Sequence, residues 1–389
     1  MTRVLHVVPN LHSYGLQNMV AGLVRSMDRT RYQPAVASLY AESEIGLEPE
    51  LRAAGIRMFH LDKRAGFDIR MYGRLGRVLR EFQPHVIHTH NYVLRYVYPL
   101  VAVRVKNAAR FPRVVHTIHN LAEREVDGIG IRLQRFAFRH GVQAVTIAAE
   151  VSASFRRVYG FEEAATIPNG IPVARYQAPS VAREAWRARH GIASGDFVYL
   201  TVARFSEQKD HATLLEAFAR GPARHPEARL LLAGAGELED AIGARVRQLR
   251  LRDRVLLIGQ RRDIADVAAA SDAFVLTSRW EGNPLAVMEA MAAALPVVAT
   301  RVGAIPELVR HGIDGILAPP GDIRAISQAM TCLLEHADKA RAMGKRGRDR
   351  ARERFDLNAM VRAYSALYRR VLGETGAHPA AEPGLVTAL

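Results

Sequence analysis

Cysteine is almost absent from this chain, whose 389 residues include only Cys332. A single cysteine excludes a disulfide within the chain, so a reducing compartment is the default expectation. The helical spacing of Cys332 with Ile326, Met330 and Leu333 predicts that its thiol is a small core group. Cysteine usage therefore favours a cytoplasmic protein without disulfide bonds.

Long apolar runs are also missing. No run approaches the roughly 18 residues that a membrane-spanning helix needs. The opening residues 1–9 are too short for a signal peptide and predict a first strand. We therefore expect a cytoplasmic protein, which could still lie peripherally on the inner face of the plasma membrane.

Several nucleotide and metal motifs are absent. Gly234 and Gly236 follow an expected strand, but no third glycine completes the dinucleotide pattern, and no P-loop pattern occurs. Asp-x-Asp occurs nowhere, so a metal-clamped diphosphate is not supported. Four histidines lie at the ends of two expected strands with spacings that fit no common zinc motif: His88, His90, His116 and His119. We expect no metal ion and no cofactor.

What the chain does contain is strand–helix alternation. Length predicts two domains, and hydrophobic and charged fractions of 49% and 24% are typical of globular proteins. The expected strands are 4–8, 35–39, 56–61, 86–88, 113–118, 144–147, 197–202, 229–233, 255–258, 273–276, 296–299 and 315–317. Helical periodicity between them predicts doubly wound parallel sheets of the α/β class. The stretch 168–179, with three prolines, is the best linker between two such units.

Two glutamates eight residues apart, Glu281 and Glu289, follow the expected strand 273–276. Between them, Asn283 is a preferred N-cap and Pro284 a preferred first helical residue, which predicts a helix from Pro284. Both carboxylates then lie at a strand–helix junction, where open α/β sheets bind ligands. The helix N-terminus could receive phosphate, which makes the carboxylates acceptors for sugar hydroxyls. A capped helix with solvated acids is the alternative.

Two cations follow another expected strand. Arg204 and Lys209 come after the strand 197–202, in a turn that leads into a helix. An arginine can clamp phosphate oxygens and a lysine acts as a point charge, so the pair suits an anionic ligand. Two solvated surface cations are the alternative reading of the pair taken alone.

Together these segments resemble the retaining nucleotide-sugar glycosyltransferases of family 4, which have the GT-B fold. The resemblance rests on an Arg-Phe turn with a lysine five residues after the arginine, and on two glutamates separated by seven residues. A Pro-Glu pair and a Gly-x-Leu-x-x-Pro segment follow in the same order. The matching residues are Arg204, Phe205, Lys209, Glu281, Glu289, Pro306, Glu307, Gly315, Leu317 and Pro320, within a match over about 166–368.

The resemblance implies two facing Rossmann-like, doubly wound parallel-sheet domains with an inter-domain cleft. The N-terminal domain, 1–172, would bind the acceptor and include a returning C-terminal helix at about 356–372. The C-terminal domain, 173–355, would bind a nucleotide-sugar donor. The implied reaction transfers a sugar to an acceptor hydroxyl with retention, in bacterial-type cell-surface polysaccharide or glycolipid assembly. The acceptor would be a glycan or a lipid-linked sugar.

The resemblance also implies residue roles. Arg204 and Lys209 would stabilise the leaving diphosphate, Glu281 would bind the transferred sugar, and no catalytic base is named. His119 would reach the donor sugar. UDP is expected before GDP. The remaining nucleotide-sugar contacts would come from Gly15, Gly234, Arg262, Asn283, Leu285 and Glu289.

The N-terminal half matches the family more loosely. Near Gly15, Tyr14 and Gln17 stand where the family has a second glycine and a glutamate, so an ordinary strand–helix turn is the alternative there. His119 and His116 could equally be satisfied strand-end histidines. His88 and His90 could line an acceptor pocket.

The net charge of +15 suggests an anionic partner. Arg70, Arg74 and Arg77 share one face of an expected helix over 69–82, which predicts an anionic membrane surface, with a solvated basic helix as the alternative. A nucleic-acid binder is a further alternative, but aromatics are 7% and none interleaves the basic run, so no nucleic acid is expected. A nucleotide-sugar 2-epimerase of the same fold is the remaining alternative.

Overall fold

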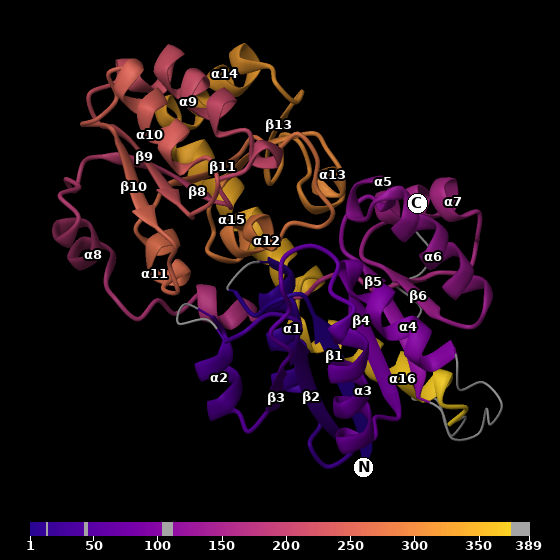
Figure 1. Ribbon diagram of the computed structural model, residues 1–389. Coiled ribbons are helices and arrows are strands. Elements are labelled where there is room, and N and C mark those ends of the chain that lie inside the picture. Colours follow the sequence, from indigo (N-terminus) through magenta and orange to yellow (C-terminus); the bar gives the residue numbers. More distant parts are fainter. Residues whose placement is uncertain (13–14, 43–45, 103–111, 375–389) are drawn as a thin grey trace.

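The protein forms two lobes, each built on one parallel sheet (Figure 1). The structure is a computed structural model that describes residues 1–12, 15–42, 46–102 and 112–374. In the first lobe, seven described strands run in the order β3-β2-β1-β4-β5-β6-β7. They are β1 (Thr2–Val8), β2 (Tyr32–Ser38), β3 (Arg57–His60), β4 (Val86–His90), β5 (Arg113–Ile118), β6 (Gln143–Thr146) and β7 (Ala165–Thr166).

The second sheet repeats this winding. Its six described strands run in the order β10-β9-β8-β11-β12-β13, and every described pairing is parallel. They are β8 (Phe197–Val202), β9 (Ala228–Ala233), β10 (Val255–Gly259), β11 (Ala273–Leu276), β12 (Val297–Thr300) and β13 (Gly315–Ala318). The predicted strands are confirmed. Only β7 was missed, because two residues are too short to show an apolar pattern.

Helices cover both faces of each sheet, which explains why the central strands are buried throughout and read as nearly continuous apolar runs. Within the described residues, no helix combines the length and apolar character needed to cross a bilayer. The α-helices are α1 (Gly15–Ser26), α2 (Glu48–Ala53), α3 (Arg70–Phe82), α4 (Leu94–Ala102), α5 (Ala122–Glu125), α6 (Gly128–Arg139), α7 (Ala149–Tyr159), α8 (Arg183–Arg189), α9 (His211–Arg220), α10 (Glu239–Gln248), α11 (Ile264–Ala269), α12 (Leu285–Ala292), α13 (Ile305–Leu308), α14 (Ile323–Glu335), α15 (Ala337–Arg354) and α16 (Leu357–Val371).

The strand orders show where the direction of winding reverses in each sheet, which is its topological switch point. In the first sheet the order reverses between β1 and β4, and in the second between β8 and β11. Open α/β sheets bind ligands in the crevice outside the carboxyl ends of the strands at such a point. The loops that follow β1 and β4 face those that follow β8 and β11 across one cleft.

The last helix returns to the first lobe, as expected. Residues 355–357 pair with Ile171 through two backbone hydrogen bonds, Ile171 N to the carbonyl of Phe355 (2.8 Å) and Leu357 N to the carbonyl of Ile171 (3.0 Å). From there α16 packs Tyr364 and Tyr368 beneath the first sheet, where both are buried. In Figure 1 this helix is the yellow segment behind the violet lobe. The predicted domain boundary at 172/173 lies between the two sheets and stays a prediction.

The lobes touch through polar contacts at α13 and at the loop before α12. Glu307 on α13 accepts hydrogen bonds from the backbone N–H groups of Ala149 and Glu150, both at 3.2 Å, at the N-terminus of α7. That terminus has no side-chain cap of its own, so a carboxylate from the other lobe supplies it. Asn283 donates to the carbonyl of Ile147 (2.9 Å), also across the boundary.

Asn283 was predicted as the N-cap of α12, and this is wrong. Its side chain is used between the lobes instead, and Pro284, with extended backbone, takes the N-cap position while the helix begins at Leu285. The prediction that Cys332 is a core group is also wrong. Cys332 lies on the exposed side of α14, while Ile326, Met330 and Leu333 of the same helix are buried.

The predicted basic face of α3 is only partly free. Met71, Leu75, Val78 and Phe82 form the buried stripe as expected. Arg70, however, pairs with the buried carboxylate of Asp68, and Arg74 donates to the carbonyls of Leu61 and Asp62. Arg77 is exposed, whereas Arg70 and Arg74 are intermediate in exposure. These contacts hold the turn before α3, so two of the three charges have a local structural use.

We expect opposite effects from alanine at two helical glycines. A Cβ at Gly344 in α15 would overlap the carbonyl oxygen of Ala294, in the turn that follows α12. Gly344→Ala should therefore lower the free energy of unfolding by about 1–3 kcal/mol, as overpacking does. Gly243→Ala in α10 meets only the end of the Arg247 side chain and should raise it by about 0.5–1 kcal/mol. Urea unfolding of both variants measures this, and equal shifts would contradict the packing described.

Candidate active site

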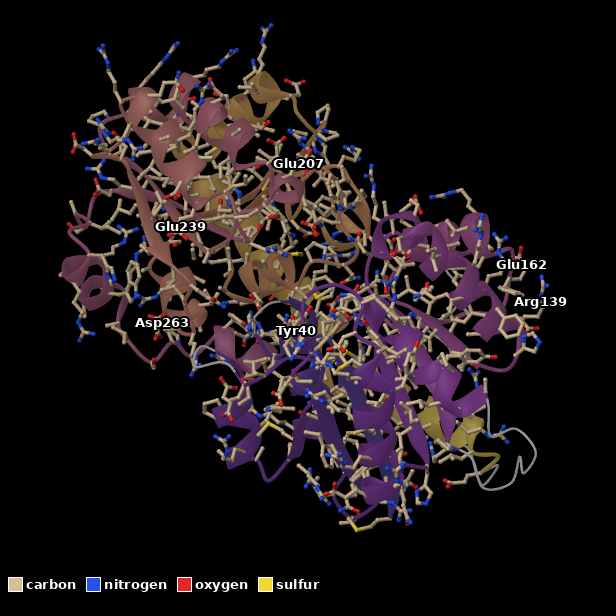
Figure 2. The ribbon with its side chains drawn as sticks, in the orientation of Figure 1. Tyr40, Arg139, Glu162, Glu207, Glu239 and Asp263 are labelled. Carbon is tan, nitrogen blue, oxygen red and sulfur yellow. The ribbon has the colours of Figure 1, made fainter. Side chains whose placement is uncertain are left out.

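A cleft of about 940 Å³ lies between the lobes. Its walls include Tyr40 from the first lobe and Glu207 from the second, both labelled in Figure 2. The ten residues that we predicted to contact the nucleotide sugar or to act in catalysis all lie in its lining: Gly15, His119, Arg204, Lys209, Gly234, Arg262, Glu281, Asn283, Leu285 and Glu289. The structure thus brings the ten residues together, and their individual roles stay predictions.

The turn after β8 is held by close backbone packing. A Cβ at Gly234 would overlap the carbonyl oxygen of Ala203, and one at Gly236 would overlap that of Phe205. The two glycines therefore allow the loops after β8 and β9 to pack backbone against backbone. Gly234 was predicted to contact the nucleotide sugar, which stays a prediction, and the structure shows that it also allows close packing against the turn that carries Arg204.

Each predicted cation meets a carboxylate. Arg204 Nη2 lies 2.9 Å from Glu237 Oε2, and both side chains are more than half exposed. Lys209 Nζ lies 2.5 Å from Glu281 Oε1, with side chains only 18% and 5% exposed. The hydroxyl of Ser278 donates to the same Glu281 oxygen at 2.6 Å. Lys209 is thus fixed in a buried pair, whereas Arg204 is free to turn toward a ligand.

The loop that carries Glu281 is packed from two sides. A Cβ at Gly282 would overlap the carbonyl oxygen of His119 in the first lobe, and a Cβ at Gly303 would overlap that of Glu281. No side chain therefore fits between the His119 loop and the Glu281 loop. The two lobes contribute adjacent backbone to the same wall of the cleft.

Glu289 stands in the second turn of α12, as predicted. Burial raises the pKa of its carboxyl, while a hydrogen bond from Tyr176 and the nearby charge of Arg175 lower it. Tyr176 and Arg175 lie in the segment Val173–Tyr176 of the predicted linker and both line the cleft. Sequence reasoning missed them, since nothing but the aromatic ring in a proline-rich stretch distinguishes Tyr176.

His119 is held at two points. Its ring Nε2 lies 2.9 Å from His90 Nδ1, and its backbone N–H donates to Glu125 Oε2 at 2.8 Å. Burial lowers the pKa of His119 to about 3, so the ring is neutral at physiological pH. Burial raises the pKa of Glu125 to about 8. Glu125 was missed, because a glutamate six residues after a histidine is no recognisable motif.

His88 and His90 do not line the cleft, so that prediction is wrong. Both rings are fully buried beneath it, because β4 turns its alternate side chains into the core of the lobe. His88 contacts the hydroxyls of Tyr368 and Thr117, each at 2.7 Å. His116 contacts Thr89 and Gln134 on the other face of the sheet and is a satisfied core histidine.

Two further predicted residues, Gly15 and Arg262, also lie in the lining of the cleft. Gly15 is the first described residue of α1, and Tyr14 beside it lies outside the described residues. Arg262 follows β10 and donates to the carbonyl of Gly46 in the first lobe at 2.7 Å. Arg175 in turn donates to the carbonyl of Arg262 at 2.9 Å. Arg262 is therefore also a link between the lobes.

The arrangement suits a ligand that combines negative charge with hydroxyl groups. Arg204 and Lys209 can neutralise phosphate, and the N-terminus of α12 adds free backbone N–H groups beside them. Glu281 and Glu289 supply hydrogen-bond acceptors a short way along the same wall. A nucleoside diphosphate with a sugar attached has both features.

Two family models together match most of the chain. The model of glycosyltransferase family 4 matches residues 14–175, and that of glycosyl transferases group 1 matches residues 182–350. The N-acetyl-alpha-D-glucosaminyl L-malate synthase of Bacillus anthracis is 33% identical over 186 residues, 48% of this chain and 49% of that protein. That alignment spans about half the length of the relative.

A second relative is aligned over more of its length. The UDP-Gal:alpha-D-GlcNAc-diphosphoundecaprenol alpha-1,3-galactosyltransferase of Escherichia coli is 26% identical over 313 residues, 77% of this chain and 79% of that protein. Among solved structures, Anabaena Alr3699/HepE in complex with UDP and glucose superposes with a TM-score of 0.83 at 18% identity. It covers 95% of this chain and 100% of its own. The two-lobed architecture is therefore that of GT-B glycosyltransferases.

The ion pairs of Lys209 and Arg204 should differ in their effect on stability. Lys209→Ala leaves the buried Glu281 carboxylate without its partner and should destabilise the fold by about 3–5 kcal/mol. Arg204→Ala breaks an exposed pair and should change stability by less than about 1 kcal/mol. Urea denaturation tests this contrast. The double variant Lys209→Met/Glu281→Gln, which removes both charges, should recover most of the loss; equal stability of the two single variants would contradict the assignment.

Proposed function

The chain belongs to the family 4 glycosyltransferases, and we propose that it transfers a sugar from a UDP-sugar to an acceptor hydroxyl, with retention of configuration and without a metal ion. One observation carries the proposal. The predicted cations Arg204 and Lys209 and the predicted acceptors Glu281 and Glu289 converge at the switch point between β8 and β11. The UDP complex of the Anabaena protein with the same fold supports the choice of UDP as nucleotide.

The leaving group poses the main chemical difficulty. As the bond between sugar and diphosphate breaks, positive charge develops on the sugar and negative charge on the phosphate. Preorganised cations aimed at the leaving group are the largest aid a protein can offer. Lys209 is held by Glu281, whose carboxylate also accepts from Ser278, and Arg204 can leave its exposed pair with Glu237 to reach the diphosphate. With these two charges the reaction needs no divalent cation.

In this proposal no carboxylate acts as a nucleophile, because Glu281 is paired with Lys209 and Glu289 with Tyr176. The departing phosphate then removes the proton of the acceptor hydroxyl on the face it leaves. The oxygen of the acceptor bonds to the anomeric carbon while the bond to the phosphate oxygen breaks. The new bond therefore has the configuration of the old one.

We propose that Glu289 accepts hydrogen bonds from the ribose hydroxyls and Glu281 accepts them from the transferred sugar, so variants of the two should affect different ligands. Glu289→Gln should weaken binding of UDP and of the UDP-sugar alike, by roughly the tenfold that one hydrogen bond to a charged group contributes. Glu281→Gln should weaken only the UDP-sugar, since its partner hydroxyls belong to the transferred sugar. Isothermal titration with both ligands measures this. Identical profiles of the two variants would reject the separate roles, and loss of turnover in EDTA would reject metal independence.

A nucleotide-sugar 2-epimerase of the same fold would also bind UDP-sugars. Product analysis separates the two activities, because an epimerase converts the donor in the absence of acceptor. A transferase incubated with donor alone should return the unchanged sugar with slow hydrolysis. A changed donor sugar would establish the epimerase instead.

The acceptor is proposed to be a glycan or lipid-linked sugar in cell-surface polysaccharide or glycolipid assembly. The diphosphoundecaprenol-linked acceptor in the name of the Escherichia coli relative supports a lipid-linked substrate. The first lobe offers a surface suited to a membrane. On α6, Ile129 and Phe136 are 75% and 54% exposed and share one face with spacing of seven. Arg132 and Arg139 are also exposed on this helix, and Figure 2 shows Arg139 at the outer edge of the lobe.

Docking through α6 should depend on its apolar side chains. The double variant Ile129→Ser/Phe136→Ser should lower partition onto vesicles of anionic phospholipid by at least about tenfold, because two side chains lose their burial in the interface. Co-sedimentation measures the partition. Ile313→Ser, at a 42% exposed site in the other lobe, is the matched control and should bind as wild type. Undiminished sedimentation of the double variant would exclude α6 as the docking surface.

A further inference from the structure

A row of three histidines leads from the core of the first lobe to the cleft. His6 lies on β1, His90 ends β4 and His119 follows β5, so the rings come from three adjacent strands. His6 Nδ1 lies 3.2 Å from His90 Nε2, and His90 Nδ1 lies 2.9 Å from His119 Nε2. His6 and His90 are fully buried, and only His119 reaches the cleft.

All three rings are neutral at physiological pH, because burial lowers the pKa of each. A neutral imidazole carries one N–H and one lone pair. His90 can therefore donate to only one neighbour and must accept from the other. The two hydrogen bonds point in the same direction along the row, either toward the cleft or away from it.

The inner end of the row decides between the two directions. His6 Nε2 is buried, and it has no hydrogen-bond partner among the described residues. If the bonds point away from the cleft, this nitrogen carries a buried N–H without an acceptor. If they point toward the cleft, it carries only a lone pair. Buried N–H groups without a partner are the rarer case in proteins, so the direction toward the cleft is favoured.

We propose that His90, oriented by His6, holds His119 in the tautomer with its proton on Nδ1, which makes His119 a hydrogen-bond donor in the cleft. The nitrogen facing His90 then accepts, and the other ring nitrogen presents its N–H. Glu125 fixes the backbone of the same residue through the N–H groups of His119 and Asn120. His90 and His6 are positioning residues that touch no ligand themselves.

The consequence rests on the proposed function. A donor at this place pairs with an oxygen of the transferred sugar, a hydroxyl or the ring oxygen. The carbonyl oxygen of His119 packs against Gly282, so its ring lies near the loop of Glu281, which is proposed to accept from the same sugar. His119 would then donate a hydrogen bond to the sugar, and Glu281 would accept one from it.

The same rings could be mistaken for a metal site, since nitrogen atoms of His6, His88 and His90 lie within 4.8 Å of one another. However, both nitrogens of His88 and both of His90 already take part in hydrogen bonds. A metal ion would have to break several of these contacts. The proposed row of hydrogen bonds leaves these contacts intact.

The proposal can be tested directly on the wild-type protein by NMR. In a 15N NMR spectrum of histidine-labelled protein without ligand, His119 should show a protonated Nδ1 and an unprotonated Nε2, assigned by the loss of its signals in His119→Asn. A protonated Nε2 on His119 would overturn the proposal. So would the uptake of one equivalent of Zn²⁺ with displacement of the His6 and His90 signals. This readout needs no turnover, so it stands even if the proposed function fails.

Variants of His90 link the tautomer to binding. His90→Leu removes the donor to His119 and should abolish its preference for Nδ1–H. Its affinity for the UDP-sugar should fall roughly two- to tenfold, the effect of one neutral hydrogen bond, while affinity for UDP is unchanged. His90→Gln, whose amide can donate in the same direction, should restore both. His116→Leu, an equally buried histidine on the other face of the sheet, is the control and should leave His119 unaltered.

Two results would contradict this role. A fall in UDP affinity equal to that in UDP-sugar affinity for His90→Leu would indicate a general structural defect. Unchanged His119 signals in that variant would show that His90 does not set the tautomer. If no UDP-sugar binds to wild type while the tautomer is as expected, the proposed function fails and the hydrogen-bond row remains.

Discussion

The rest of this structure depends on the contact between the loop from Glu281 to Asn283 and the first lobe. This loop has no room for side chains at two places, where Gly282 meets the His119 carbonyl and Gly303 meets the Glu281 carbonyl. Asn283 then reaches the carbonyl of Ile147 in the other lobe. Because backbone packs against backbone, small shifts in either lobe move the cleft wall directly. A change in the relative position of the two domains therefore also changes the shape of the site.

Electrostatics explains why this cleft can hold an anionic ligand yet remain stable when empty. Lys209 and Arg204 are each neutralised by a carboxylate, so no bare charge is buried without a partner at either position. The two pairs differ in exposure, and this difference assigns them different tasks. The buried pair keeps a fixed charge in place, while the exposed pair can exchange Glu237 for a ligand at small cost. In the proposed row of hydrogen bonds, the neutral rings of His6 and His90 orient His119 without adding charge to the cleft.

Much of the fold could be predicted because its signals are local. Buried parallel strands leave apolar runs such as Phe197–Val202, and the helices between them leave a helical period. The four charged site residues stood out for the same reason, since each follows a strand end. What failed were predictions about single side chains. Asn283 looked like a helix cap and Cys332 like a core residue, because local pattern does not reveal which neighbour from a distant segment competes for the position.

By itself, the sequence determined the α/β class and the paired doubly wound sheets, because these follow from periodicity, while the resemblance to a known family supplied the ten residues expected at the site. The tertiary structure alone decided which groups surround those residues. Glu125 beneath His119, Tyr176 against Glu289 and Glu307 at the start of α7 come from segments with no shared motif. The row from His6 to His119 joins residues more than a hundred positions apart, and its direction depends on one unpartnered nitrogen among the described residues. Contacts of this kind follow from packing in three dimensions, which no local pattern encodes.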